Sequence, residues 1–198
     1  MNKVKQTLIS HMSAMQRQFA NLEDLQIEKF VEIIKQNKAT VFLTGIGKNA
    51  HVASTTASTF SSIGIKSRFL DPVEAVHGEM GNIENNDLII AISKSGNTSE
   101  LLNFLKKFKE INKVTKIVSL SSNEKSQMVT LADLSIVIDI EKEIDKYNIV
   151  PTISIATYIL FLQSIGYCVA EQKGFNLAMF KKNHPGGVIG DKLRGLEL

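Results

Sequence analysis

The sequence predicts an α/β protein built on a parallel, doubly wound sheet. Short runs of aliphatic and β-branched residues recur along the chain, and segments with helical periodicity separate them. Apolar runs without polar alternation are typical of strands in a sheet that helices cover on both faces. Polar turns follow the first three of these runs, and ligands bind at that place in such sheets.

The first part of the chain predicts helix, strand, helix and strand. The first 38 residues carry apolar side chains at a spacing near 3.6 and predict a helical segment, which residues 21–24 could divide in two. Residues 40–44 predict a β-branched strand that a glycine turn ends. Residues 49–62 are rich in Ala, Ser and Thr, which predicts a helix that packs closely on the sheet. A second strand follows at residues 67–70.

The rest of the chain continues this alternation. A loop that contains Asp71, Pro72 and Gly78 leads into the third strand. Pro151 suits the first turn of the last helix, because the N–H that proline lacks is unsatisfied there in any residue. The expected strands are residues 88–92, 116–120 and 134–138, and the expected helices are residues 97–110, 125–131 and 151–173.

Length and composition predict one globular domain over residues 1–198. Apolar residues make up 43% of the chain and charged residues 22%, as in ordinary soluble proteins. The net charge of +3 is small and the lysines are spread among acids, so we expect no nucleic-acid partner. We find no signal peptide and no uninterrupted membrane span. Cys168, the single cysteine, excludes an internal disulfide, fits a cytoplasmic location, and is expected to be buried in an apolar helix.

The turn after the third strand has the composition of a phosphate site. Ser93, Ser95 and Thr98 offer hydroxyls just before a helix, where free backbone N–H groups attract an anion. Gly96 permits a backbone conformation that a side chain would forbid. Glu100 falls in the first turn of the helix and can point back toward the ligand. A plain N-cap would need fewer hydroxyls.

The turn after the first strand joins glycines to a lysine. Gly45-Ile46-Gly47-Lys48 lacks the third glycine and the later acid of a dinucleotide fingerprint, and it does not have Walker A spacing. Backbone approach at Gly47 and the point charge of Lys48 can still hold a charged ligand. A tight turn with a solvated lysine is the other interpretation.

Two histidines lie in glycine-rich segments, where core packing explains them poorly. His77 and His184 therefore suit general acid–base chemistry. A metal site is the alternative, but no HxH or HxxxH spacing supports it. Glu143 lies in the charged run 141–146, which by itself predicts a solvated loop.

These motifs resemble the sugar isomerase (SIS) domain and, within it, the D-arabinose-5-phosphate isomerases of the 3-deoxy-D-manno-octulosonate (Kdo) pathway. At Lys94 the chain departs from the family, whose members usually have Asn or Ser there. The matching segments are Gly45-Ile46-Gly47-Lys48-Asn49-Ala50-His51, Glu74 to Gly81, Ala91 to Glu100, Val150-Pro151-Thr152 and His184 to Gly190.

The resemblance implies a three-layer α/β/α SIS fold with a five-stranded parallel, flavodoxin-like sheet, without the CBS modules that follow it in many relatives. It implies the interconversion of D-ribulose 5-phosphate and D-arabinose 5-phosphate through an enediol, in a cytoplasmic homotetramer. The reaction needs neither a redox cofactor nor a metal. The implied catalytic residues are Lys48, His77, Glu100, Glu143 and His184. The implied sugar-phosphate contacts are Ser93, Ser95 and Thr98, and the matching segments add Gly47, Gly96 and Thr152.

Two alternatives and one question stay open at this point. The chain could isomerise another phosphosugar, such as a heptose or hexulose phosphate. It could also be a sugar-phosphate-sensing module, although the first 38 residues are too few for a DNA-binding domain beside the leading helix. The sequence does not decide which of Glu100, Glu143, His77 and His184 takes the carbon-bound proton.

Overall fold

A computed structural model describes residues 2–196 of the chain. In that part of the chain, five parallel strands form one sheet in the order β2-β1-β3-β4-β5, which confirms the predicted flavodoxin-like topology. The observed bounds lie within one or two residues of the expected ones. The strands are β1 Val41–Gly45, β2 Ser67–Leu70, β3 Leu88–Ile92, β4 Lys116–Ser121 and β5 Leu134–Val137.

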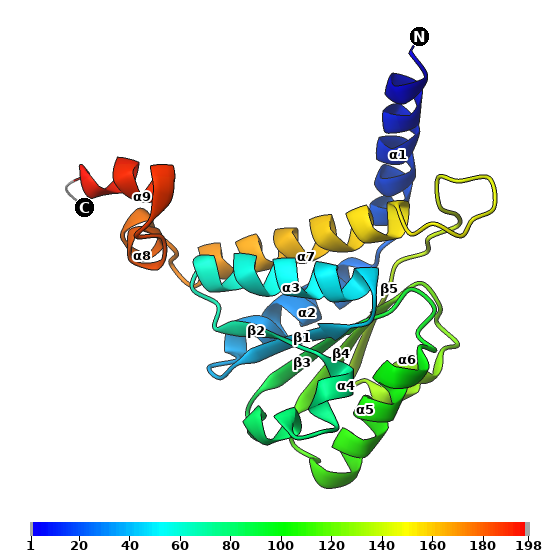
Figure 1. Cartoon of the computed structure of the whole chain (residues 1–198), viewed down its shortest axis with the longest axis horizontal. Helices are drawn as coiled ribbons and strands as arrows, with labels where there is room; N and C mark the ends of the chain where they lie inside the picture. The colour runs from blue at the N-terminus through cyan, green and yellow to red at the C-terminus, as the bar shows by residue number, and fades with distance from the viewer. Residues whose placement is uncertain (1, 197–198) are drawn as a thin grey trace.

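Helices cover both faces of the sheet, because successive strand residues point to opposite sides. Leu43 and Ile90 face the larger core, whereas their neighbours Phe42 and Ile89 face the smaller one. Figure 1 shows α3 and α7 on one side of the sheet and α5 and α6 on the other. The helices of the larger core are α2 Asp24–Gln36, α3 Lys48–Ser62 and α7 Ile153–Gln172, and those of the smaller core are α4 Pro72–Ala75, α5 Ser99–Ile111 and α6 Gln127–Leu131.

Helix α7 is the central helix of the larger core. It packs closely on α3, since a Cβ at Gly166 would come within 2.3 Å of the Phe60 ring. By length and composition it is the one helix in residues 2–196 that could cross a membrane, and 56% of its apolar window is buried. The expectation for Cys168 was wrong. This residue lies on the exposed face of α7, because the helix buries only the sides that meet α2, α3 and the sheet.

Helical segments extend beyond the layers at both ends of α7. Helix α1, Lys3–Ala20, projects past the start of α7, and α8, Leu177–Asn183, and α9, Gly187–Arg194, lie past its end (Figure 1). The sequence predicted a break in the leading helix, and α1 and α2 confirm it. It did not predict α4, α8, α9 or the 3-10 turn η1, Glu79–Asn82.

Candidate active site

The turns after β1, β3 and β4 meet at the carboxyl edge of the sheet, where the polar motifs were expected. A pocket of about 380 Å³ opens there, beside the start of α3 and the start of α5. The two helices direct their N-termini, and so their free N–H groups, toward this edge. The pocket is lined by Asn49, Ser93, Lys94, Ser95, Thr98 and Ser122.

Three hydroxyls gather in the turn after β3. Ser93 Oγ lies 2.9 Å from Thr98 Oγ1 and 3.5 Å from Ser95 Oγ, and it accepts a hydrogen bond of 3.1 Å from the Gly96 N–H. Ser95 Oγ accepts one of 3.2 Å from the Asn97 N–H. Ser93 is only 2% exposed, whereas Ser95 is exposed and Thr98 is half-buried. Ser93 therefore holds the turn from behind, and Ser95 and Thr98 present their hydroxyls to the pocket.

Gly96 fixes the shape of this turn. Its φ is +63°, in the left-handed region, and an added Cβ would lie 2.2 Å from Ser126 Oγ. Its carbonyl oxygen accepts a hydrogen bond of 3.0 Å from the Met128 N–H. Gln127 N–H donates to Asn97 Oδ1 at 3.0 Å. The segment after β4 thus clamps the turn from outside, and the hydroxyls are in place before any ligand arrives.

The N-terminus of α5 adds positive potential to the hydroxyls. Thr98 is its N-cap, and among the described residues its side chain bonds to Ser93 rather than to an N–H of the first turn. The first-turn N–H groups other than that of Glu100 remain available to an anion. Glu100 is exposed in the first turn, where its own backbone N–H and the Ser99 hydroxyl lower the pKa of its carboxyl group. Glu100 is thus a carboxylate two residues from the pocket-lining Thr98.

The glycine turn after β1 brings Lys48 to the same edge. Gly47 has a φ of +60°, and Lys48 is the first residue of α3 and is exposed. The next residue, Asn49, lines the pocket. A Cβ at Gly45 would approach the Asn49 backbone and the Ile92 carbonyl oxygen at 3.0 Å, so glycine allows β1, β3 and α3 to meet this closely. The tight turn therefore delivers a cation to the pocket rim.

Glu143 lies beside the N-terminus of α7. Its segment, residues 141–146, is a largely exposed loop as predicted, but the Glu143 side chain is turned inward and is only 2% exposed. Its Oε2 accepts hydrogen bonds from the Thr152 N–H at 2.8 Å and the Ser154 N–H at 3.2 Å, and the Thr152 hydroxyl lies 3.3 Å away. Its Oε1 forms an ion pair of 2.7 Å with Lys94 Nζ. Thr152, which the resemblance implied as a sugar-phosphate contact, here orients Glu143.

The charge of Glu143 is stabilised despite its burial. Burial by itself raises the pKa of the carboxyl group. The hydrogen bonds from Lys94, Ser154 and the Thr152 backbone outweigh it and lower the pKa to about 2. Tyr158 lies in the same region of α7, and burial together with the Glu143 charge raises the pKa of its hydroxyl. Glu143 is therefore a carboxylate at every physiological pH.

The two histidines are not in this pocket. His184 ends α8 and stacks on Phe180 with ring centroids 4.1 Å apart. Its neighbour Asn183 donates to the carbonyl oxygens of Ser61 and Ser62, at the far end of α3 from Lys48. Helix α3 has 15 residues, so about 21 Å of helix separates the two positions. Within one chain His184 does not meet the pocket.

His77 lies nearer the carboxyl edge but not on the pocket wall. It occupies an exposed turn after α4, at the end of the chain segment that follows β2. The sequence predicted a loop there, and Asp71 instead caps α4 by accepting from the Val73 N–H at 2.8 Å. In residues 2–196, no three His, Cys, Asp or Glu side chains gather as metal ligands would.

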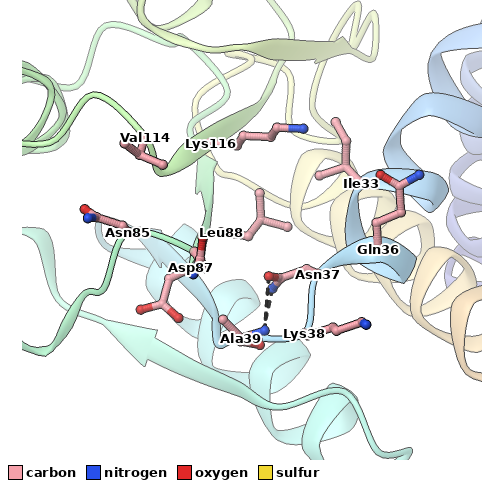
Figure 2. A pocket seen from close by; sticks show the side chains of 11 residues that line it. Ile33, Gln36, Asn37, Lys38, Ala39, Asn85, Asp87, Leu88, Val114 and Lys116 are labelled. Carbon is pink, nitrogen blue, oxygen red and sulfur yellow. Dashed lines mark hydrogen bonds between the residues drawn. The ribbon is translucent and has the colours of Figure 1, made fainter.

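A larger cavity, of about 630 Å³, lies at the opposite edge of the sheet (Figure 2). Its polar groups serve the chain itself. Asp87 Oδ1 accepts from the Thr40 N–H at 2.7 Å, its Oδ2 accepts from the Glu84 N–H at 2.7 Å, and Asn37 bonds to Ala39. Because these side chains hold the entries to β1 and β3, the amino edge has a structural role, and the candidate active site stays at the carboxyl edge.

Sequence reasoning missed three residues of the pocket wall. Lys94, Asn49 and Ser122 line the pocket but were not among the predicted site residues. Lys94 had a local signal, since it stands between two predicted phosphate-binding serines. Asn49 follows the predicted Lys48. Ser122 had no local signal in the sequence, because it reaches the pocket only through the pairing of β3 with β4.

Comparison with known proteins defines the class: residues 33–165 match the SIS domain family, and the chain belongs to it. The predicted resemblance is thereby confirmed. Among its relatives are the arabinose 5-phosphate isomerase KdsD of Francisella tularensis, 34% identical over 87% of this chain, and KpsF of Escherichia coli, 31% identical over 96%. The chain spans only 53% and 58% of the lengths of these two relatives.

A solved structure supports the same placement. A protein of Escherichia coli CFT073, in complex with arabinose 5-phosphate, superposes with a TM-score of 0.83 and is 28% identical. The match covers 93% of this chain and 100% of that chain. The SIS fold is thus shared over nearly the whole sequence, including the segments that build the pocket.

Proposed function

We propose that this protein is an aldose–ketose isomerase that interconverts D-ribulose 5-phosphate and D-arabinose 5-phosphate and so supplies Kdo biosynthesis for lipopolysaccharide or capsule. The observation that carries the proposal is a pocket-lining turn whose Lys94 is ion-paired with a buried carboxylate. A hydroxyl-lined turn at the start of α5 suits a phosphate dianion, and a buried carboxylate, Glu143, stands beside it. Relatives at 31–34% identity are named arabinose 5-phosphate isomerases.

The reaction requires a base, an oxyanion stabiliser and a phosphate site, and groups of these kinds surround the pocket. A base takes a proton from C1 of the ketose while O2 is protonated, which gives an enediol. A proton then returns to C2 while O1 loses its proton and becomes the aldehyde oxygen. Ser93, Ser95 and Thr98, with the Gly47 and Gly96 backbones, would hold the phosphate, and that remote binding would orient the reacting carbons. Lys48 would stabilise the developing oxyanion.

The carboxylates and the histidines divide the proton transfers between them. Glu143 is ionised and buried, so it can accept a proton from carbon without competing water, and Glu100 stands across the turn as a second carboxylate. Imidazole can both give and take a proton near neutral pH, so His77 and His184 suit the transfer between O1 and O2. Thr152 would support the reaction by orienting Glu143.

The distance of His184 from the pocket supports an assembly in which a second copy of the chain supplies it. We therefore propose a homotetramer whose sites are shared between chains, in which residues 1–198 form one SIS domain. We further propose a cytoplasmic enzyme that uses no cofactor or metal and binds neither nucleic acid nor membrane.

The test is direct. The purified protein is incubated with D-ribulose 5-phosphate, and the C1 aldehyde and C2 proton of the product are followed by NMR in heavy water. Formation of D-arabinose 5-phosphate with deuterium at C2 supports the proposal. A matched assay with hexulose and heptulose phosphates covers the alternative phosphosugars. Saturable binding of a sugar phosphate without turnover of any of them would instead identify a sensing module.

A further inference from the structure

Lys94 connects the two halves of the candidate site. It stands between Ser93 and Ser95 in the turn after β3, residues 93–98, which we call the phosphate turn. It lines the same pocket as these two serines. Its carbonyl oxygen accepts a hydrogen bond of 2.9 Å from the Ser122 N–H, so its backbone is held by the next turn of the edge. Its side chain reaches Glu143 Oε1 at 2.7 Å, across 49 residues of sequence. Lys94 therefore belongs to the phosphate turn by its backbone and to Glu143 by its side chain.

The two oxygens of Glu143 have different partners. Oε2 is satisfied by the N-terminus of α7 through the Thr152 and Ser154 N–H groups. Oε1 has Lys94 as its hydrogen-bond donor within the described residues. Glu143 is 2% exposed, whereas the Lys94 side chain is 31% exposed. The carboxylate is therefore fixed, and the lysine is the member of the pair that can move.

From this geometry we propose that Lys94 is a positioning residue for the isomerisation. In the empty pocket its ammonium pairs with Glu143, and when the substrate phosphate enters the turn the ammonium transfers to it, which frees Oε1 to act as the base. This inference rests on the proposed function, and it adds a residue and an order of events to it.

The charges favour such a transfer. A phosphate dianion carries more charge than a carboxylate, and a lysine is a point charge on a flexible stem that can serve either. Removal of an opposite charge from contact distance raises the pKa of a carboxyl group by about 1–3 units. A general base works best when its pKa approaches the operating pH. The phosphate would thus make Glu143 a stronger base at the moment the substrate is bound.

Other charges near Glu143 bear on this prediction. A cavity of about 490 Å³ between α1 and the segment after β5 borders Glu143 on its far side. Its own segment and α1 provide charges of both signs there, and these do not move with the phosphate. The titratable and charged groups around Glu143 are Lys94 in the phosphate turn, Tyr158 in α7, Arg17 in α1, and Asp139, Glu141 and Lys142.

The experiment measures the pKa of Glu143 directly. The protein is labelled with 13C at the glutamate side-chain carboxyl, and the Glu143 resonance is assigned by its loss in Glu143→Gln. It is then titrated with and without saturating sulfate, which has the shape of the substrate phosphate and keeps its two charges at the acidic pH where Glu143 titrates. We expect this phosphate mimic to raise the Glu143 pKa by about 1 unit or more in the wild-type chain. In Lys94→Met the pKa should be raised already and should respond much less to the mimic.

Two further variants serve as controls. Lys125→Met removes a lysine from the exposed loop after β4, outside the pocket, and should leave the response at the wild-type size. Lys94→Gln keeps a neutral donor and serves if Lys94→Met does not fold; it should lose the response in the same way. Kinetically, Lys94→Met should raise the KM for the sugar phosphate about tenfold or more, because a hydrogen bond between charged groups is lost.

Each outcome decides the inference. A Glu143 pKa that ignores the phosphate mimic in the wild-type chain would overturn it, and so would a response of full size in Lys94→Met, since the charge of the mimic would then act without the lysine. Isomerase activity in the wild-type chain tests the proposed function separately. An active enzyme without the phosphate response would refute only the role of Lys94. The response in a chain without isomerase activity would refute the role in catalysis.

Discussion

Active-site sharing between chains can be tested by mixing two inactive variants. His184→Ala removes the histidine at the far end of α3, and Glu143→Gln removes the carboxylate that pairs with the pocket-lining Lys94. About 21 Å of α3 lies between the two regions, which no side chain can bridge. If both residues serve the reaction, each single variant should lose activity, with turnover for His184→Ala reduced roughly 10²–10⁴-fold. Folding should persist in both, because neither change opens the apolar core.

The expected recovery follows from counting chains. Two variants with different affinity tags are coexpressed in equal amounts, and mixed assemblies are purified through both tags. If one chain supplies Glu143 and another supplies His184, a site is intact when the first is His184→Ala and the second is Glu143→Gln. Random assembly makes about one quarter of the sites intact, so about a quarter of wild-type turnover should return.

The same mixture also contains the refutation. If each site used both residues from one chain, every chain would carry a defect and turnover would stay at the level of the single variants. The double variant, coexpressed with a surface variant such as Lys125→Met, is the matched control: about a quarter of its sites should be intact if sites are shared between chains, and about half if each chain supplies both residues. Turnover in the test mixture should return to about a quarter of the wild-type value if sites are shared between chains. It should not return at all if one chain supplies both residues.

Three further changes address the pocket itself. Ser95→Ala should raise the KM for the sugar phosphate roughly 10- to 100-fold at little cost in kcat, by loss of a hydrogen bond to a charged group, and unchanged steady-state KM would count against the phosphate turn. Gly96→Ala should lower the free energy of unfolding in urea by more than Gly174→Ala does. Both have positive φ, but a Cβ at Gly96 meets Ser126 Oγ at 2.2 Å and one at Gly174 meets open space. The lowered pKa of Glu143, about 2 against an ordinary 4.5, predicts about 3 kcal/mol of stability that is present above pH 4.5 and lost as the pH falls toward 2. Glu143→Gln should flatten this decline in the free energy of unfolding, measured in urea at each pH. An unchanged dependence on pH would contradict the buried ion pair.

The strands could be predicted because each carries its own signal. A parallel strand that is buried on both faces must be apolar along its length, and residues 88–92 satisfy that rule without reference to any partner. The phosphate turn was equally visible, since its hydroxyls are adjacent in sequence. Its place beside the other polar turns then followed from the rule that ligand-binding turns share the carboxyl edge.

Glu143 and His184 were harder for physical reasons that the structure makes clear. The burial of Glu143 depends on Lys94, which lies 49 residues away, and on the free N–H groups of a helix that begins about ten residues later. A charged run gives no local sign of such partners. His184 does lie in the turn after α8, as the proline and glycines that follow it predicted. Phe180 stands four residues earlier in α8, and the stacking of the two rings was the signal that was overlooked.

Helix α3 separates the pocket of a chain, at Lys48, from the histidine that the chain could supply to a partner, His184. Its first turn carries Lys48, and its last carbonyl groups hold Asn183 beside His184. Gly166 packs closely on Phe60 and so joins this helix to α7, which keeps the distance between the two ends of α3 fixed. A two-fold axis that brings His184 of one chain to the pocket of a second chain also brings His184 of the second chain to the pocket of the first. Both sites of the pair are then complete. A screw arrangement of the same contacts would leave an unmatched end on every filament, so a site shared in this way would favour closed symmetry over open polymerisation.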